Sequence, residues 1–371
     1  MLFNIKANTV KILVITNSSG GLYTFRGMLL DRLISIGHIV SVVTPIGEKI
    51  EELEKLGVSL FRVKMDRRGI NPIKDASLFK SYFHIVKEIK PDLIITYTIK
   101  PNVYGGIVAR ITKTKYAANI TGLGSALENK GIVQKIALSL NRHALKKAKV
   151  VFFENQMNAD YFVKSEVITK SQVHTLHGAG VDLSHYTYKS YPDDSSEFRF
   201  LFIGRVMKEK GIEELITALR RIRSKGMLCS LDVVGIFDEE QLKPLINECS
   251  DEGWLHYQGL QNDVRPFIEN SHCFVLPSYH EGMANSNLEC AACGRPIITS
   301  NIPGCKEAVL DGTSGFLCEP HNVDSLYEAL TKMLKLSRTE RESMGLQGRK
   351  YMEAVFDKQK VVDETISELM K

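Results

Sequence analysis

The segment CFVLPSYHEGMANSNLECAACGRPIITS, residues 273–300, contains a complete strand–helix–strand pattern. The apolar run at 273–277 predicts a buried strand, and PIITS at 296–300 predicts a second one. Between them the sequence predicts a helix over 287–293, with Gly294 just past its end and Pro296 soon after. Two short apolar strands joined through a helix indicate parallel neighbours in an α/β sheet.

The same alternation extends through the rest of the chain. Helices are predicted near 22–36 and 212–224, and further strands at 11–17, 38–44, 92–98, 115–120, 149–154, 198–204 and 230–235. Two such series predict two doubly wound, Rossmann-like α/β domains. A polar stretch at 186–198, which includes Pro192, predicts the linker between them.

These patterns divide the chain into three parts. We expect an N-terminal domain over 1–187, a C-terminal domain over 198–350, and a helix over 351–371 that could pack across both. The chain has 371 residues, of which 25% are charged and 44% hydrophobic, so each domain can bury its own core.

The sequence contains no export or membrane-spanning signal. Its start, MLFNIKANTVKILVI, lacks the apolar region and cleavage site of a signal peptide. No stretch approaches the roughly 20 apolar residues that cross a bilayer. We therefore expect a soluble or peripheral protein.

The seven cysteines are odd in number and do not indicate a disulfide framework. Cys290 and Cys293 form a C-x-x-C pair, which leaves a redox or metal site open. Their small neighbours favour plain packing in a helix.

Charge is divided unevenly along the chain. Residues 1–186 hold 26 Lys and Arg against 14 Asp and Glu, a net +12, whereas residues 187–371 hold 22 against 29, a net −7. The basic half is expected to meet something anionic, with nucleic acid, a membrane surface and phosphorylated substrates as candidates.

The loop GRVMKEKG, residues 204–211, follows the predicted strand 198–204 directly. Gly204 allows the backbone to turn, and Arg205 and Lys210 stand just before a helix that begins near residue 212. Two cations and the free amides of a helix N-terminus suit a diphosphate. The alternative is ordinary solvated surface charge.

Two carboxylates, Glu281 and Glu289, flank the predicted turn and helix start after strand 273–277. Amides at a helix start suit phosphate oxygens, and carboxylates accept hydrogen bonds from sugar hydroxyls. A nucleotide diphosphate-sugar offers both kinds of group. The alternative is that Ser286 and Glu289, spaced S-x-x-E, only form a capping box.

Together these segments resemble the retaining glycosyltransferases of family 4, which have the GT-B fold of two Rossmann-like domains facing a cleft. The segment from Glu281 to Glu289 resembles the family's E-x7-E motif, and 204–211 resembles its G-R…K-G loop. Gly180-Val181-Asp182 with Tyr186 and the pair Gly20-Gly21 match two further family segments. The matches cover most of the chain in the expected order.

The resemblance implies roles for individual residues. Arg205 and Lys210 would neutralise the donor diphosphate, Glu281 would contact hydroxyls of the transferred sugar, and Glu289 would bind the ribose. Other donor-binding positions implied by the resemblance are Gly21, Gly204, Gly282, Met283, Ala284, Asn285 and Ser286. It also implies that neither a cofactor nor a metal is required.

The acceptor side is less clearly defined by the sequence. Many family members carry a His in the first domain, but the corresponding loops here, 96–102 and 119–125, contain none. Thr98, Lys100 and Thr121 are the candidates in these loops, and Arg67 and Arg68 supply nearby basic charge.

A basic amphipathic helix is expected over 132–149. It could lie on an anionic membrane or simply pack on the core, and the helix taken alone favours core packing. The charge of the whole domain favours an acceptor that carries phosphate.

Within the family, DRRGINP, KPNVYGG and ITGLGS most resemble bacterial enzymes that extend lipid-linked oligosaccharides. This implies a UDP-N-acetylhexosamine donor, with UDP-GalNAc favoured, and an undecaprenyl diphosphate-linked acceptor. It also implies peripheral contact with an anionic membrane at the cytoplasmic face, and no nucleic-acid partner.

Other functions remain open at this stage. They are a UDP-sugar epimerase, a glycosidase that uses Glu281 and Glu289, and a non-catalytic nucleotide-sugar sensor. The first loop, TNSSGGLYTFRG, is not G-x-G-x-x-G and argues against a dinucleotide oxidoreductase.

Overall fold

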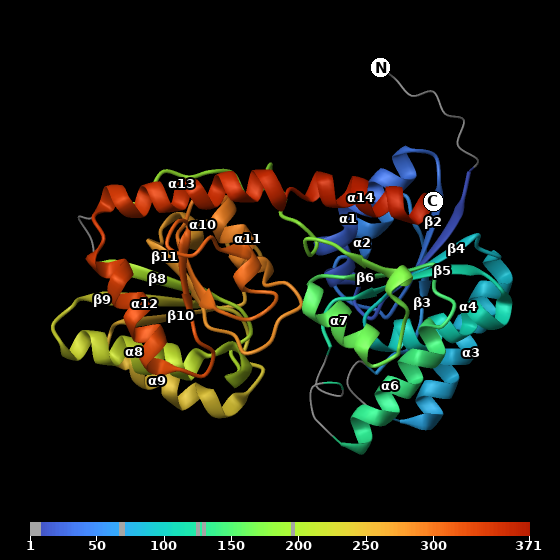
Figure 1. Cartoon of the computed structure of the whole chain (residues 1–371), viewed down its shortest axis with the longest axis horizontal. Helices are drawn as coiled ribbons and strands as arrows, with labels where there is room; N and C mark the ends of the chain where they lie inside the picture. The colour runs from blue at the N-terminus through green and yellow to red at the C-terminus, as the bar shows by residue number, and fades with distance from the viewer. Residues whose placement is uncertain (1–8, 67–70, 124–126, 128–130, 194–196) are drawn as a thin grey trace. The chain divides into compact units, whose positions relative to one another are not determined.

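The computed structural model describes residues 9–66, 71–123, 127, 131–193 and 197–371 (Figure 1). The chain forms two compact units, one of Met1–Ala179 with Gln359–Lys371 and the other of Gly180–Lys358. The first unit thus ends at 179 rather than at 187, and it includes the last helix of the chain.

Unit 1 contains a seven-stranded parallel sheet in the order β3-β2-β1-β4-β5-β6-β7. The strands are β1 Lys11–Ile15, β2 Ile39–Thr44, β3 Ser59–Arg62, β4 Leu93–Tyr97, β5 Lys115–Ile120, β6 Val150–Phe153 and β7 Val173–Thr175. The helices are α1 Ser19–Ser35, α2 Ile50–Lys55, α3 Pro72–Ile89, α4 Gly106–Thr112, α6 Ile132–Leu145, α7 Gln156–Lys164 and α14 Lys358–Met370, with a π-helix η1 at Pro101–Gly105 and a 3₁₀ turn η2 at Lys170–Gln172.

Alternation along the strands of unit 1 builds a separate core on each face of the sheet. Ile12 and Val14 of β1 pack on one face with α1, α2 and α14. Leu13 and Ile15 pack on the other with α3, α4, α6 and α7. The strands are therefore buried on both sides, which explains their continuous apolar sequences.

Unit 2 contains a six-stranded parallel sheet in the order β10-β9-β8-β11-β12-β13. The strands are β8 Phe198–Ile203, β9 Cys229–Val234, β10 Leu255–Gly259, β11 Cys273–Leu276, β12 Ile297–Ser300 and β13 Gly315–Cys318. The helices are α8 Ile212–Ser224, α9 Lys243–Asp251, α10 Arg265–Glu269, α11 Asn285–Ala292, α12 Val323–Lys335 and α13 Arg338–Val355, with 3₁₀ turns η3 Lys208–Lys210, η4 Glu240–Leu242 and η5 Lys306–Ala308.

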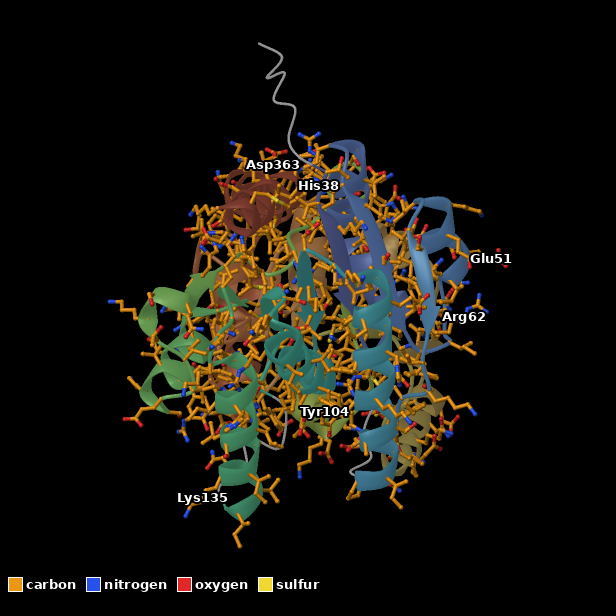
Figure 2. All side chains as sticks on the ribbon, turned by 90° about the vertical axis from the view of Figure 1, so that its right-hand side faces the viewer. His38, Glu51, Arg62, Tyr104, Lys135 and Asp363 are labelled. Atoms are coloured by element: carbon orange, nitrogen blue, oxygen red, sulfur yellow. The ribbon has the colours of Figure 1, made fainter. Side chains whose placement is uncertain are left out.

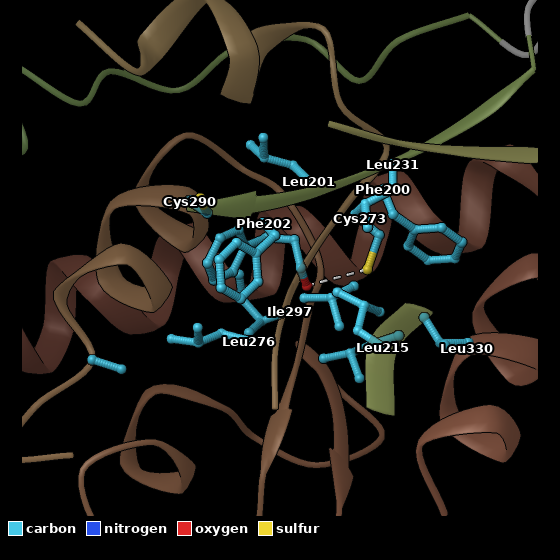
Figure 3. Packing of buried hydrophobic residues seen from close by; sticks show 14 of the residues in the cluster. Phe200, Leu201, Phe202, Leu215, Leu231, Cys273, Leu276, Cys290, Ile297 and Leu330 are labelled. Atoms are coloured by element: carbon cyan, nitrogen blue, oxygen red, sulfur yellow. Dashed lines mark hydrogen bonds between the residues drawn. The ribbon is translucent and has the colours of Figure 1, made fainter. Parts of the chain in front are cut away.

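The core of unit 2 is centred on β8 and β11 (Figure 3). Phe200 and Phe202 are fully buried beside Cys273 and Leu276. Leu215 of α8 and Leu330 of α12 complete the packing around these strands. This core fixes the position of the loops that follow β8 and β11.

The predicted linker at 186–198 packs against unit 2 over its described part. Arg295 is fully buried, and its guanidinium donates to the carbonyl oxygens of Lys189 (3.3 Å) and Ser190 (2.8 Å). Tyr191 is also buried, and its hydroxyl donates to the carbonyl oxygen of His272 at 2.8 Å. A buried cation needs such partners, so this polar stretch is fixed in place although its composition is that of a linker.

Candidate functional site

The order of strands in unit 2 reverses between β8 and β11. The chain runs from β8 outward to β9 and β10, then returns to place β11 on the other side of β8. In a doubly wound sheet this reversal marks the crevice at the carboxyl ends of the strands where ligands bind. The loops 204–211 and 277–284, which both contain predicted site residues, follow these two strands.

Lys210 and Glu281 meet at this reversal point. The Lys210 ammonium forms an ion pair with Glu281 Oε1, and Ser278 Oγ donates to the same oxygen at 2.9 Å. Their side chains are only 16% and 13% exposed. The fold therefore brings together two predicted residues that stand 71 positions apart, in a place shielded from most solvent.

Two backbone features hold the loops of this pair together. Gly211 has a φ of +69°, and a Cβ there would lie 2.1 Å from the carbonyl oxygen of Pro277. The Tyr279 amide donates to the Glu209 carbonyl oxygen at 2.9 Å, and the Tyr279 hydroxyl donates to Glu214 Oε1 at 2.6 Å. Tyr279 carries no sequence signal for this role, because the contacts depend on adjacency of β8 and β11.

Arg205 lies on the same loop but contacts a different residue. Its guanidinium pairs with Asp238 Oδ2 at 2.7 Å, and its side chain is 46% exposed. Asp238 follows β9, on the far side of β8 from Glu281. The two predicted cations thus stand on either side of the end of β8.

The start of α11 differs from the predicted capping box. Ala284 is the N-cap residue and makes no side-chain cap, so Ser286 lies inside the helix and the alternative of a capping box between Ser286 and Glu289 is wrong. The Ala284 amide donates instead to the Gly304 carbonyl oxygen at 2.7 Å. That contact requires close approach, since a Cβ on Gly304 would lie 2.6 Å from the Gly282 carbonyl oxygen.

The first turn of α11 nevertheless presents polar groups. The amides of Asn285 and Ser286 occupy positions that have no partner within a helix. Asn285 Oδ1 is buried and receives no hydrogen bond from any residue that the structure describes. Among the donor-binding positions that the resemblance implies, the amide of Ala284 is already bonded, while those of Asn285 and Ser286 have the geometry of a phosphate-binding helix start.

Glu289 is mostly buried and lies against Tyr186 and Lys358. Burial raises the pKa of its carboxyl to about 7, although a hydrogen bond from Tyr186 and the charge of Lys358 both lower it. The resemblance includes Tyr186, but its hydrogen bond to Glu289 depends on the fold and has no signal in the sequence. A carboxyl poised in this way can accept hydrogen bonds from hydroxyl groups once it is ionised.

In unit 1 the strand order reverses between β1 and β4; Gly21 and Thr98 come after these two strands, and Thr121 comes after β5, the neighbour of β4. Gly21 lies in the first turn of α1, and its amide donates to Ser18 Oγ at 3.1 Å. Thr98 has a φ of +76°, rare for a β-branched residue, and its buried Oγ1 has no hydrogen-bond partner among the described residues. Thr121 is partly buried just after β5.

Lys100 is not a plain surface lysine. It forms an ion pair with Asp75 at 2.7 Å, and the two side chains are 15% and 12% exposed. Asp75 lies in the first turn of α3, which begins at Pro72 with Asn71 as its cap. Arg67 and Arg68, the other basic candidates, lie outside the described residues.

The segment after β4 contains a π-helix that the sequence did not reveal. This π-helix, Pro101–Gly105, continues into α4. Thr96 Oγ1 donates to Asn102 Oδ1 at 2.7 Å, and Asn102 Nδ2 donates to the Asn119 carbonyl oxygen at 2.8 Å. Single π turns are frequent at functional sites, and this one fixes the chain just after Thr98.

The C-x-x-C pair packs in the core. All seven cysteines are buried and unpaired. Burial raises the pKa of the Cys290 thiol well above its usual range and that of Cys293 to about 11, so neither thiolate forms readily near neutral pH. Within the described part of the chain, no three His, Cys, Asp or Glu side chains form a group that could hold a metal ion.

Comparison with known proteins places this geometry in a family. Residues 188–351 match the family described as "Glycosyl transferases group 1", and residues 11–155 match "Glycosyl transferase 4-like". The two matches cover both units and both reversal points.

The chain is a glycosyltransferase, with residues 188–351 in the group 1 family and residues 11–155 in the 4-like family.

Curated relatives resemble the glycosyltransferase over most of its length. It is 26% identical over 346 residues to a Campylobacter jejuni N,N'-diacetylbacillosaminyl-diphospho-undecaprenol alpha-1,3-N-acetylgalactosaminyltransferase, covering 88% of this chain and 90% of that protein. It is 25% identical to an Escherichia coli UDP-Gal:alpha-D-GlcNAc-diphosphoundecaprenol alpha-1,3-galactosyltransferase, covering 72% of each.

A solved structure supports the fold. The Anabaena protein HepE, in complex with UDP and glucose, superposes with a TM-score of 0.80 at 19% identity, over 97% of this chain and 99% of that one. The glycosyltransferase therefore has the GT-B fold, as the sequence predicted.

The buried carboxyl of Glu289 gives the glycosyltransferase a measurable pH dependence. Its pKa rises from 4.5 to about 7 on folding, so between these values the folded state binds more protons than the unfolded state. Stability should therefore fall as pH rises from about 4.5 to 7, and this contribution should level off above 7. Thermal melts of Glu289→Gln should lack this component, and identical pH profiles for both proteins would contradict it.

Proposed function

We propose that this glycosyltransferase moves a sugar from a UDP-sugar to a lipid-linked saccharide, with retention of the anomeric configuration. The transferred sugar is an N-acetylhexosamine, with GalNAc favoured, and the acceptor carries undecaprenyl diphosphate. The names of the two relatives support this substrate class, since both act on diphosphoundecaprenol-linked saccharides. Bound UDP in the Anabaena structure supports the nucleotide.

The observation that carries the proposal is the shielded Lys210–Glu281 pair at the reversal point of unit 2. A diphosphate gains negative charge as the bond from its oxygen to the sugar C1 breaks. Lys210 stabilises that charge, and Arg205 and the first amides of α11 add to it, because donors fixed in advance need no reorganisation during reaction. Glu281 accepts hydrogen bonds from hydroxyls of the transferred sugar, and Glu289 accepts them from the ribose.

Bond changes in the proposed step involve only donor and acceptor. The acceptor hydroxyl oxygen bonds to C1 on the face that the diphosphate leaves, and its proton passes to an oxygen of the departing diphosphate. The protein contributes by positioning and by charge. Because Lys210 and Arg205 neutralise the leaving group, we propose that no metal is needed.

Calorimetric titration tests this assignment. UDP-GalNAc, UDP-GlcNAc, UDP and GDP-mannose are titrated into the whole chain with and without EDTA, followed by turnover on an undecaprenyl diphosphate-linked saccharide. We expect one UDP-sugar to bind tightly regardless of EDTA and to be transferred. Isomerised donor without transfer would indicate an epimerase, and the absence of any nucleotide binding would overturn the proposal.

Peripheral contact with an anionic membrane is part of the proposal, and α6 is the element that supports it. Its first turns expose Ile132, Val133, Ile136 and Leu140, at 77%, 55%, 55% and 42%. Only the far end of the helix, from Asn141 to Leu145, has buried side chains. Ala137 and Leu138 are partly buried against the core, so core packing does not account for the exposed Ile132, Val133, Ile136 and Leu140.

Basic residues accompany this apolar stripe. Lys135, labelled in Figure 2, lies near the exposed start of α6, and Arg142, Lys146 and Lys147 follow toward its end. An apolar stripe beside cations suits the surface of an anionic bilayer. None of the described helices is long and apolar enough to cross one.

Flotation of the protein with phosphatidylglycerol vesicles tests this contact. Ile132→Ser/Ile136→Ser should lower the fraction bound to phosphatidylglycerol vesicles by about tenfold, since each lost side chain removes apolar burial. Ile73→Ser/Ile111→Ser replaces two exposed isoleucines elsewhere in unit 1 and should leave binding unchanged. An equal loss in both variants would count against α6.

A further inference from the structure

A hollow lies at the amino ends of the unit 1 strands, whereas Gly21, Thr98 and Thr121 come after the carboxyl ends of strands. It has a volume of about 660 Å³ and is bordered by the residues that precede β1, β4, β5 and β6. The end of α14, from Leu369 to Lys371, forms another wall, and Figure 1 shows the C-terminus beside the strands of unit 1. None of the residues that line this hollow has a role in the proposed sugar transfer.

The lining of this hollow is rich in lysine. Six lysines border it, and Asp92 is the one acidic side chain in the lining. Asp92 accepts a hydrogen bond from the Lys11 amide at 2.8 Å, and Lys371 is paired with Glu368. The other five lysines have no ion pair within the described chain: Lys87, Lys90, Lys113, Lys115 and Lys149.

Helix ends explain part of this cluster but not all of it. Lys90 and Lys113 are the C-cap residues of α3 and α4, where a cation is favourable. Lys115 begins β5 and Lys149 precedes β6, so no helix end accounts for them. They come from neighbouring strands and thus bring like charges close together.

Lys115 and Lys149 repel each other because their like charges lie close together. Lys149 Nζ donates to the Leu369 carbonyl oxygen at 2.8 Å, so it is held in place rather than free to move into solvent. Burial and the charge of Lys115 lower the pKa of Lys149, although the nearby Glu368 carboxylate raises it. A bound anion would relieve the repulsion, and concentrated positive charge in a concave wall attracts multivalent anions.

We propose that this lysine-lined hollow binds a multivalent, phosphate-bearing ligand at a site separate from the donor site. The volume falls within the roughly 300–1,000 Å³ typical of small-molecule sites. Ammonium groups are strong donors to phosphate oxygens. The ligand is either a free polyphosphorylated compound or a phosphorylated lipid headgroup, and it contacts lysines from α3, β5 and the end of α4. This inference does not depend on the proposed sugar transfer.

Binding of inorganic tripolyphosphate to the whole chain tests the free form of the ligand. Titrations use the unaltered protein and Lys210→Ala, in about 0.15 M salt so that weak surface attraction is screened. Lys87→Glu/Lys115→Glu changes two exposed lysines of the lining that have ordinary backbone angles. Lys55→Glu/Lys80→Glu makes the same change in charge at exposed positions outside the lining.

We expect tripolyphosphate to bind Lys210→Ala as well as the unaltered chain, and to bind Lys87→Glu/Lys115→Glu at least tenfold more weakly. The Lys55→Glu/Lys80→Glu control should keep its affinity. Flotation on vesicles that contain phosphatidic acid, whose headgroup is a phosphomonoester, tests the lipid form with the same variants. Vesicle binding that falls only in the lining variant would assign a headgroup, whereas tripolyphosphate binding that falls only in that variant would assign a free ligand. Equal losses in lining and control variants, or no binding of either probe, would overturn the proposal.

Discussion

Replacing Lys210 with alanine should lower kcat for sugar transfer by about 100- to 1,000-fold, the range seen when one preorganised donor to a developing negative charge is removed. The Lys210 side chain is 16% exposed, and its ammonium is held by Glu281 at the end of β8. Water cannot readily replace it there, and Arg205, which pairs with Asp238 on the other side of β8, cannot also take the place of Lys210 beside Glu281. The loss should appear mainly in kcat, because the charge on the leaving group is greatest in the transition state.

Lys208→Ala is the matched control for this variant. Lys208 belongs to the same short 3₁₀ turn, but its side chain is exposed. It should retain near-normal turnover, and both variants should keep the circular dichroism spectrum of the unaltered protein. If Lys210→Ala keeps more than a tenth of the activity, the charge of the leaving group is neutralised elsewhere and the site assignment fails.

The sequence predicted the two strands that precede Lys210 and Glu281 because the signals for such strands are local. Every predicted strand is present, with ends that differ by at most two residues. Buried parallel strands have continuous apolar runs, so they stand out from their neighbours. Once β8 and β11 are recognised, the loops that follow them are the natural place for Lys210 and Glu281.

The edge strands could not be predicted in the same way. β3, β7, β10 and β13 are short and only partly buried, as in LHYQG of β10, where His256 and Tyr257 are exposed. Without a continuous apolar run, such segments look like loops. They add width to each sheet but do not change the reversal point that positions the site.

Contacts between residues far apart in the sequence explain what the sequence did not predict about the site. The S-x-x-E spacing at Ser286 is real, but the Gly304 carbonyl oxygen binds the Ala284 amide and starts the helix earlier. The sequence names Lys100 as a candidate but does not indicate its ion pair with Asp75 of α3. Each difference depends on a partner far away in the sequence, and no local pattern reports such a partner.

Removing Glu281 should have two separable effects. Glu281→Ala should lower kcat/KM by about 100-fold, because the transferred sugar loses an acceptor for its hydroxyl hydrogen bonds and Lys210 loses its fixed position. It should also destabilise the free protein, since Lys210 is then left in a shielded place without the carboxylate that now pairs with it. Activity and thermal melts of the same preparations measure both.

The double variant Glu281→Ala/Lys210→Ala measures how strongly the two residues depend on each other. In Glu281→Ala/Lys210→Ala no charge is left without its partner, so the double variant should melt at a higher temperature than the sum of the single losses predicts. Glu281→Gln keeps the shape and the hydrogen bond from Ser278 Oγ while it removes the charge, and it should melt between Glu281→Ala and the unaltered protein. Strictly additive losses in both melting and turnover would mean that Lys210 and Glu281 act independently. In that case the ion pair would be a consequence of their proximity, and the sugar-binding role of Glu281 would have to be tested without reference to Lys210.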